Sequence, residues 1–159
     1  MKKELNILII FVVVWCLGLI AAPLLYDQTL SKIIYRFYSV VCHQFDSRSF
    51  HIYGKPFAVC IRCTSIYAGF LLALCFVRLI PELRSKKFNT WLLLSVFSIP
   101  MLIDGSLSML SIINYSMLSR IITGSLFGIG MALLMHQMLT EIIHTQLFKR
   151  TNEYEHTTG

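Results

Sequence analysis

The stretch from Cys42 to Gly69 holds the side chains best suited to chemistry. It reads C-H-Q-F-D-S-R-S-F-H-I-Y-G-K-P-F-A-V-C-I-R-C-T-S-I-Y-A-G and contains three of the five cysteines. Its C-x-x-C motif, Cys60 to Cys63, begins an apolar block, so both sulfurs should lie on one face of a helix, one turn apart. The start of a helix stabilises a thiolate, which is the form of cysteine that attacks disulfides and binds metals.

Cys42, His43, Cys60 and Cys63 together form a donor set typical of a zinc site. Zinc takes sulfur and imidazole nitrogen ligands in a tetrahedral arrangement. We therefore predict that these four residues bind a transition metal, with zinc as the expected ion. If one coordination position is open, the metal could act on a membrane-associated anionic substrate. If the protein fills all four positions, the metal is structural.

Two other interpretations of the cysteines stay open. The C-x-x-C pair could exchange thiols and disulfides, with Cys42 as the third partner. Alternatively, two of the three cysteines form a structural disulfide and the third is simply buried. An outward-facing location would favour both interpretations, because disulfides persist in oxidising compartments.

Three charged residues that interrupt or border apolar blocks are the second signal: Arg62, Asp104 and Arg120. A charge at the bilayer centre costs about 2.5–3.5 kcal/mol on insertion scales, so such residues are often functional. We predict that they are catalytic, with Asp104 as a general base, a metal ligand or an acceptor for His43. The two arginines would suit an anionic group such as a lipid phosphate. An ion pair between Asp104 and either arginine is the structural alternative.

Four apolar blocks must position these residues. The chain has 159 residues, is 56% hydrophobic and only 14% charged, and has a mean hydropathy of +0.68. About 20 helical residues cross the ~30 Å hydrocarbon core of a bilayer. The fold class is therefore an all-α integral membrane bundle with four transmembrane helices, at about 5–25, 57–80, 90–113 and 120–143. These helices form a single transmembrane domain over 1–145, followed by a polar cytoplasmic tail at 146–159.

The loop after the first block contains a further helical pattern. Apolar residues recur at helical spacing across about 29–42, with Lys32, Arg36 and His43 on the opposite side. This pattern predicts an amphipathic interfacial helix, which either lies in the headgroup plane or packs over the mouth of the bundle. Eight lysines and arginines lie on the side of the termini and five on the other side. This bias favours the cytoplasmic (inner) membrane with both termini in the cytoplasm and the cysteines facing outward.

The expected partner is the lipid bilayer, together with an anionic lipid or a small anionic ligand. The net charge of +6 comes mainly from residues at the ends of apolar blocks, and no basic stripe with interleaved aromatics is present. We therefore expect no nucleic acid partner. Gly124 and Gly128 form a small-xxx-small face that predicts close helix packing, or a contact in a homo-oligomer. A small transporter or a purely structural membrane protein are the remaining functional classes.

Three motifs and two downstream positions resemble a known family. The motifs are C-H-Q at Cys42, R-S-F at Arg48, and C-x-R-C-T-x-x-Y-x-G from Cys60 to Gly69. Together with Asp104 and Arg120-x-x-x-Gly124, they resemble a family of small bacterial predicted integral membrane proteins of unknown function. The resemblance implies a fold and a placement of the polar residues, and it implies no activity. Ser65 stands where that family usually has glycine.

The chain also shows a looser similarity to quinone-linked disulfide-oxidising membrane proteins. These are four-helix bundles with a C-x-x-C motif near the second helix. Their second cysteine pair, between the third and fourth helices, has no counterpart at 114–119. Likeness at the level of the fold does not by itself establish a shared function.

Overall fold

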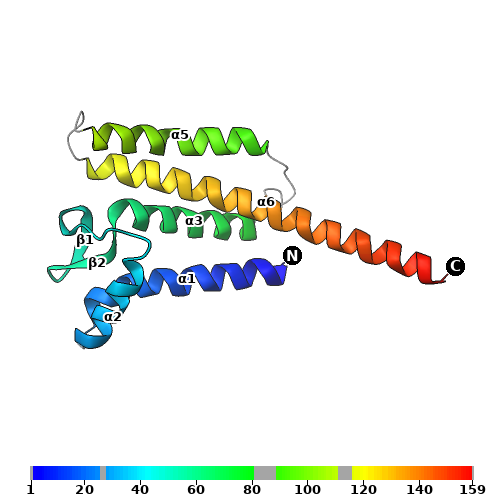
Figure 1. The fold of residues 1–159 in the computed structure, drawn as a ribbon, viewed down its shortest axis with the longest axis horizontal. Helices are drawn as coiled ribbons and strands as arrows, with labels where there is room; N and C mark the ends of the chain where they lie inside the picture. Colours follow the sequence, from blue (N-terminus) through cyan, green and yellow to red (C-terminus); the bar gives the residue numbers. More distant parts are fainter. Residues whose placement is uncertain (1, 26–27, 81–88, 111–115, 159) are drawn as a thin grey trace.

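The computed structural model describes residues 2–25, 28–80, 89–110 and 116–158. Four long helices lie side by side in the spatial order α1, α3, α6, α5 (Figure 1). Their bounds are Lys2–Leu24 for α1, Ile61–Leu79 for α3, Thr90–Met109 for α5 and Met117–Thr158 for α6. Each has a segment long and apolar enough to cross a membrane. The predicted helical fold with four membrane spans is therefore confirmed.

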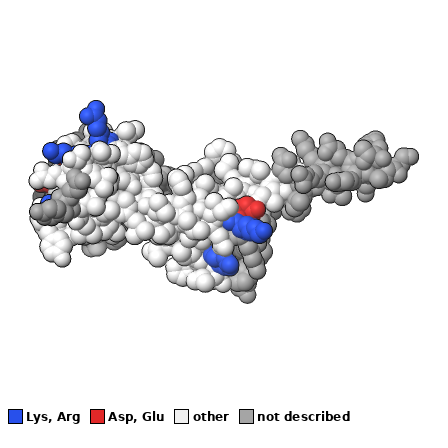
Figure 2. Space-filling view, turned by 90° about the horizontal axis from the view of Figure 1, so that it is seen from below, with Lys and Arg blue, Asp and Glu red and all other residues white. Residues whose placement is uncertain are grey.

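The short elements gather at the end of the bundle opposite both chain termini (Figure 1). They are α2 (Gln28–Tyr38), the short 3₁₀ helix η1 (Asp46–Arg48), and the strands β1 (Ser49–Ile52) and β2 (Lys55–Cys60). Figure 2 shows charged side chains at the two ends of one face, with a broad band of other residues between them. This distribution fits a chain whose middle lies in hydrocarbon.

The two strands form an antiparallel hairpin that the sequence analysis did not predict. Ile52 pairs with Lys55 and Ser49 pairs with Cys60 across it. Tyr53 and Gly54 both have positive φ, at 50° and 77°, as a tight two-residue hairpin turn requires. Residues 57–60, which were predicted to begin the second transmembrane helix, lie instead in β2, and α3 begins at Ile61. The apolar run could not show where the extended strand changes to a helix, because both are apolar here.

The fourth candidate membrane span is Met117–Ile143, close to the predicted 120–143. The helix that carries it, α6, continues beyond this span to Thr158. No proline or glycine lies between Gly130 and Gly159 to interrupt it, so the helix can continue into water. The third helix was expected to reach 113, but α5 ends at Met109, and 111–113 lie outside the described residues.

The centre of the bundle is the close contact between α3 and α6. Gly69 of α3 faces the backbone of Ser125, and Gly128 of α6 faces the backbone of Ile66 and Phe70. A Cβ atom at either glycine would overlap these backbone atoms. The predicted small-residue face of the fourth helix is therefore occupied within the chain, by α3.

Helix α2 packs on the end of α1 and also presents an apolar edge outward. Ile34 and Tyr38 belong to a hydrophobic cluster that includes Leu19 and Ala22 of α1. Ile33 and Phe37 are exposed. The helix ends at Tyr38, earlier than the predicted 42, and a turn leads from there to Cys42. The structure thus supports packing over the bundle mouth and leaves a second apolar edge suited to lipid.

Candidate metal centre

Three cysteine sulfurs converge at the end of the bundle that holds the hairpin. The Sγ atoms of Cys42, Cys60 and Cys63 all lie within 4.8 Å of one another. Zinc–sulfur bonds of about 2.3 Å in tetrahedral geometry place two sulfurs about 3.8 Å apart, so only small movements would be needed. All five cysteines of the chain lie within the described residues and are free thiols. The three cysteines thus form a cluster that could hold a metal ion.

The junction between strand and helix positions two of these thiols. Cys60 is the last residue of β2 and the N-cap of α3, and Cys63 follows one turn later. The backbone N–H of Cys60 donates a hydrogen bond to Sγ of Cys42 at 3.2 Å. The neighbouring thiols of Cys60 and Cys63, together with this N–H, lower the pKa of Cys42 well below its usual range. Cys42 is therefore prepared to be a thiolate, the form that binds metals.

Gln44 ties the loop that carries Cys42 to the strand that carries Cys60. Its side-chain Nε2 donates hydrogen bonds to the carbonyl of Tyr35 at 2.6 Å and to the carbonyl of Ala58 at 2.7 Å. Its backbone has a φ of 50°. Gln44 belongs to the C-H-Q motif, but no role was predicted for it from the sequence. The motif was a signal that this residue mattered, but its partners are backbone atoms that a sequence pattern does not reveal.

Aromatic side chains form a wall on one side of the thiols. The ring of Trp15 meets the rings of Tyr38 and Tyr67 edge to face, with centroids 5.0 and 5.9 Å apart. The hydroxyl of Tyr38 donates to the carbonyl of Trp15 at 2.8 Å. These residues pack in the same hydrophobic cluster as the three cysteines. The cluster therefore lies between α3 and the α1–α2 side of the molecule, where Cys42 is buried and Cys60 and Cys63 are partly exposed.

The structure does not bring His43, the fourth predicted ligand, into the thiol cluster. Its side chain is exposed, and its ring stacks on Phe45 with the centroids 6.1 Å apart. Cys42, the preceding residue, is only 7% exposed. Consecutive side chains in this loop thus point in different directions, which adjacency in the sequence could not show.

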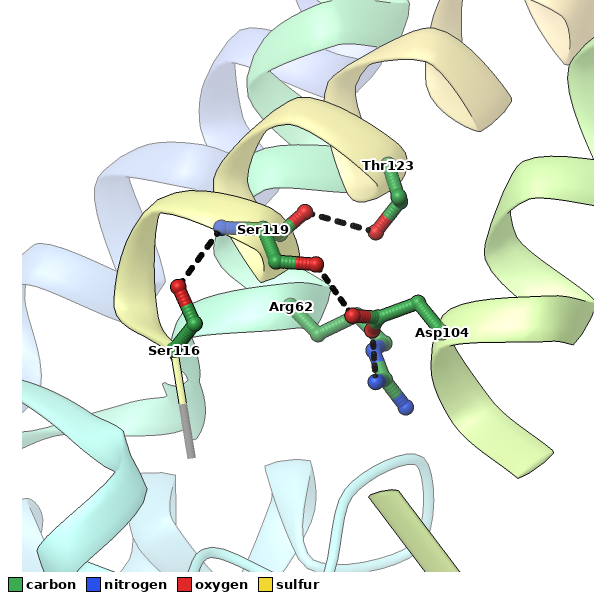
Figure 3. Close-up of polar contacts among 5 residues, drawn as sticks. All are labelled: Arg62, Asp104, Ser116, Ser119 and Thr123. Atoms are coloured by element: carbon green, nitrogen blue, oxygen red, sulfur yellow. Dashed lines mark hydrogen bonds and ion pairs between the residues drawn. The ribbon is translucent and has the colours of Figure 1, made fainter. Parts of the chain in front are cut away.

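Arg62 and Asp104 belong to a separate network at which three helices meet (Figure 3). Arg62 of α3 donates from Nη2 to Oδ2 of Asp104 on α5. Ser119 of α6 donates from its hydroxyl to the other carboxylate oxygen. The Arg62 and Asp104 side chains are 20% and 13% exposed, so most of this ion pair is buried. The ion pair proposed as the structural alternative is thus present, with Ser119 as a partner that was not predicted.

Arg120 is buried, at 6% exposed, near the start of α6. It lies one turn before Gly124, whose face of α6 meets α3 at the carbonyl of Arg62. Arg120 is therefore at the same end of the bundle as the network. Arg62 and Cys63 are consecutive on α3 and so point about 100° apart. The four predicted metal ligands and the three predicted charged residues therefore do not form one site. The thiols lie on one side of α3, and the ion pair lies on another.

Fold and site together define a multi-pass membrane protein with a three-thiol cluster at one end of its bundle. Residues 42–134 match the family described as "Predicted membrane protein (DUF2085)". The chain belongs to this family, whose function is unknown. The matching region begins at Cys42 and contains all seven predicted site residues.

Two uncharacterised archaeal proteins are similar to the chain. Protein MJ1492 of Methanocaldococcus jannaschii is 31% identical over 153 residues, which cover 91% of this chain and 97% of that protein. A protein of Methanothermobacter thermautotrophicus is 34% identical over 104 residues, covering 65% of this chain and 92% of its own length. No solved structure matches. The resemblance seen in the sequence was to bacterial proteins, whereas these two relatives are archaeal.

Proposed function

We propose that Cys42, Cys60 and Cys63 bind a transition metal ion, with zinc as the expected metal. The observation that carries this proposal is the convergence of three sulfurs from two chain segments to within 4.8 Å. Thiolate sulfur is a ligand that zinc prefers, and the lowered pKa of Cys42 favours its thiolate form. The aromatic wall covers one side of the ligands, as the surroundings of a metal site often do.

The proposed location of this centre is the extracytoplasmic face of the cytoplasmic membrane. The excess of lysine and arginine on the side of the termini supports a cytoplasmic position for both ends of the chain. The thiols lie at the other end of the bundle from the termini, which is consistent with this orientation (Figure 1).

Three protein sulfurs leave a fourth coordination position for a metal. His43 could take it only by leaving Phe45, so our proposal for the protein ligands rests on the three cysteines. A zinc ion with one open position supplies Lewis-acid chemistry. A membrane-associated anionic compound remains the ligand class that we propose for this protein. The guanidinium of Arg62 is the cation that we assign to this anion, and Asp104 holds it in place through their ion pair.

Metal analysis of purified protein tests the proposal directly. Wild type should carry about one metal ion per chain, and Cys60→Ser should lose most of it, because two sulfurs seldom hold a structural metal. Cys75→Ser is the matched control, since Cys75 is a free thiol on the same helix but outside the cluster. Absence of metal from both wild type and Cys60→Ser, after growth with added zinc, would end the proposal.

Thiol–disulfide exchange is the second candidate function. It is favoured by the contact of Cys42, with its lowered pKa, with both thiols of the C-x-x-C motif. Alkylation of the protein under oxidising and reducing conditions tests it. A cluster that exchanges disulfides should gain or lose two reactive thiols between the two conditions. Cysteines that never change state would exclude this candidate.

A further inference from the structure

A groove of about 630 Å³ lies on the side of α3 away from the thiols, where α3, α5 and α6 meet. One stripe of α5 forms its long wall: Ser98, Met101, Leu102, Gly105, Ser106 and Met109. Their spacing of three and four residues places them on one face, over a length of about 16 Å. Phe127 of α6 also lines the groove, and among the described residues Arg62 is its only charged lining residue. The groove is therefore long, mainly apolar and cationic at one point.

The guanidinium group of Arg62 has capacity for another acceptor. Its Nη2 donates to Asp104, while its Nε is buried and has no hydrogen-bond partner among the described residues. Its Nη1 lies 3.7 Å from where a Cβ of Gly105 would be, which places it at the groove wall. The Arg62 side chain is 20% exposed, so the guanidinium lies at the boundary between the packed helices and the groove. A guanidinium N–H without an acceptor in a low-dielectric setting favours a hydrogen-bonded anion.

We propose that this groove binds one anionic membrane lipid, with its phosphate at Arg62 and a hydrocarbon chain along the α5 stripe. A free phosphate would use the guanidinium but would leave the apolar wall uncovered. Only Leu93 is buried among the described residues of α5, so this helix borders the bilayer along most of its length. A lipid can therefore enter sideways from the membrane. This inference rests on the anionic ligand class proposed above and names the compound as a lipid. The site is separate from the thiol cluster, so its test does not depend on metal binding.

Four substitutions test separately how lipid binding depends on the charge at Arg62 and on the shape of the groove. Asp104→Asn removes the competing carboxylate and should strengthen binding of an anionic lipid. The double variant Arg62→Gln with Asp104→Asn removes the cation without leaving an unpaired buried carboxylate. Gly105→Leu should fill the groove while keeping every charge. Gly105→Ala is its matched control, because its Cβ would meet Arg62 at 3.7 Å, an ordinary contact distance.

Lipid retention is measured by native mass spectrometry of the full chain, after equilibration in nanodiscs of equal phosphatidylglycerol and phosphatidylcholine. Wild type and Gly105→Ala should retain phosphatidylglycerol preferentially. The double variant should lose this preference by about tenfold, the effect of one charge-assisted hydrogen bond. Gly105→Leu should retain neither lipid. Circular dichroism and gel filtration confirm that each variant is folded before its lipids are compared.

Three outcomes would overturn the proposal. Equal retention of both lipids by wild type would show that the groove does not select an anion. An unchanged preference in the folded double variant would show that Arg62 does not provide the contact. Displacement of phosphatidylglycerol by millimolar inorganic phosphate, with no effect of Gly105→Leu, would identify a free phosphate site instead.

Discussion

Two polar regions lie on different sides of α3, and they differ in how they are assembled. The thiol cluster comes from a loop and a strand–helix junction that are close in the sequence, and it is sheltered by α1 and α2. The ion-pair network draws one residue each from α3, α5 and α6. The first is made by local chain geometry, whereas the second exists only when the long helices are packed together.

The two regions also differ in the chemistry they offer. Sulfur donors that contact one another lower the pKa of Cys42 and favour a soft or borderline cation. The network pairs Arg62 with Asp104 and so nearly cancels its own charge, leaving weak attraction for an anion. Consecutive residues, Arg62 and Cys63, thus serve regions with opposite ligand preferences. The helix alone separates them, because it turns about 100° per residue.

The largest expected effect comes from separating α3 and α6, which both regions need. Gly128→Leu should lower the free energy of unfolding by about 3 kcal/mol, because the new side chain overlaps the backbone of Ile66 and Phe70. Denaturant titration in detergent, followed by circular dichroism, measures this change. Gly105→Ala, on the loosely packed α5, is the control and should be nearly neutral. Equal stability of Gly128→Leu and wild type would contradict the close α3–α6 contact.

A smaller effect should follow from breaking the network alone. Arg62→Gln should cost about 2 kcal/mol of stability, because it leaves the mostly buried carboxylate of Asp104 without its cation. The double variant Arg62→Gln with Asp104→Asn should recover part of this loss. The same samples should keep their full metal content, since the thiols lie on the other side of α3. Loss of metal from folded Arg62→Gln protein would show that the two regions form one site.

The smallest effect is expected at His43. His43→Ala should change stability by less than about 0.5 kcal/mol, because the side chain is exposed and its main contact is with Phe45. It should also leave the metal content near the wild-type value. The metal content of His43→Ala should be measured alongside that of Cys42→Ser, which should lose the metal. A loss in His43→Ala as large as that in Cys42→Ser would make His43 the fourth ligand, through a rearranged loop.

Much of the fold was predictable because hydrocarbon imposes simple rules. Runs of about 20 apolar residues predict membrane spans, and the four spans are confirmed. The shared face of Cys60 and Cys63 follows from helical spacing, and Cys42 does join them. An ion pair of Asp104 with an arginine follows from the cost of a lone charge in a membrane, and Arg62 is its partner.

The remaining features depend on contacts that a pattern does not encode. Depth along the helices placed Arg62 and Asp104 level with the cysteines, but depth does not tell which side of α3 each residue faces. The hairpin was missed because residues 57–60 are as apolar as the helix that follows. The role of Gln44 rests on hydrogen bonds to two backbone carbonyls. Each of these features depends on how separate segments contact one another, which is seen only in the three-dimensional structure.

Metal content and free-thiol count, measured on one sample of purified protein, test the central claim most directly. We predict about one zinc ion per chain. All five cysteines should react as free thiols once the protein is denatured with a chelator. Three of them should resist alkylation in the native, metal-loaded protein. A sample without metal in which two of the five thiols are missing would show a disulfide at the cluster and would contradict the proposed metal centre.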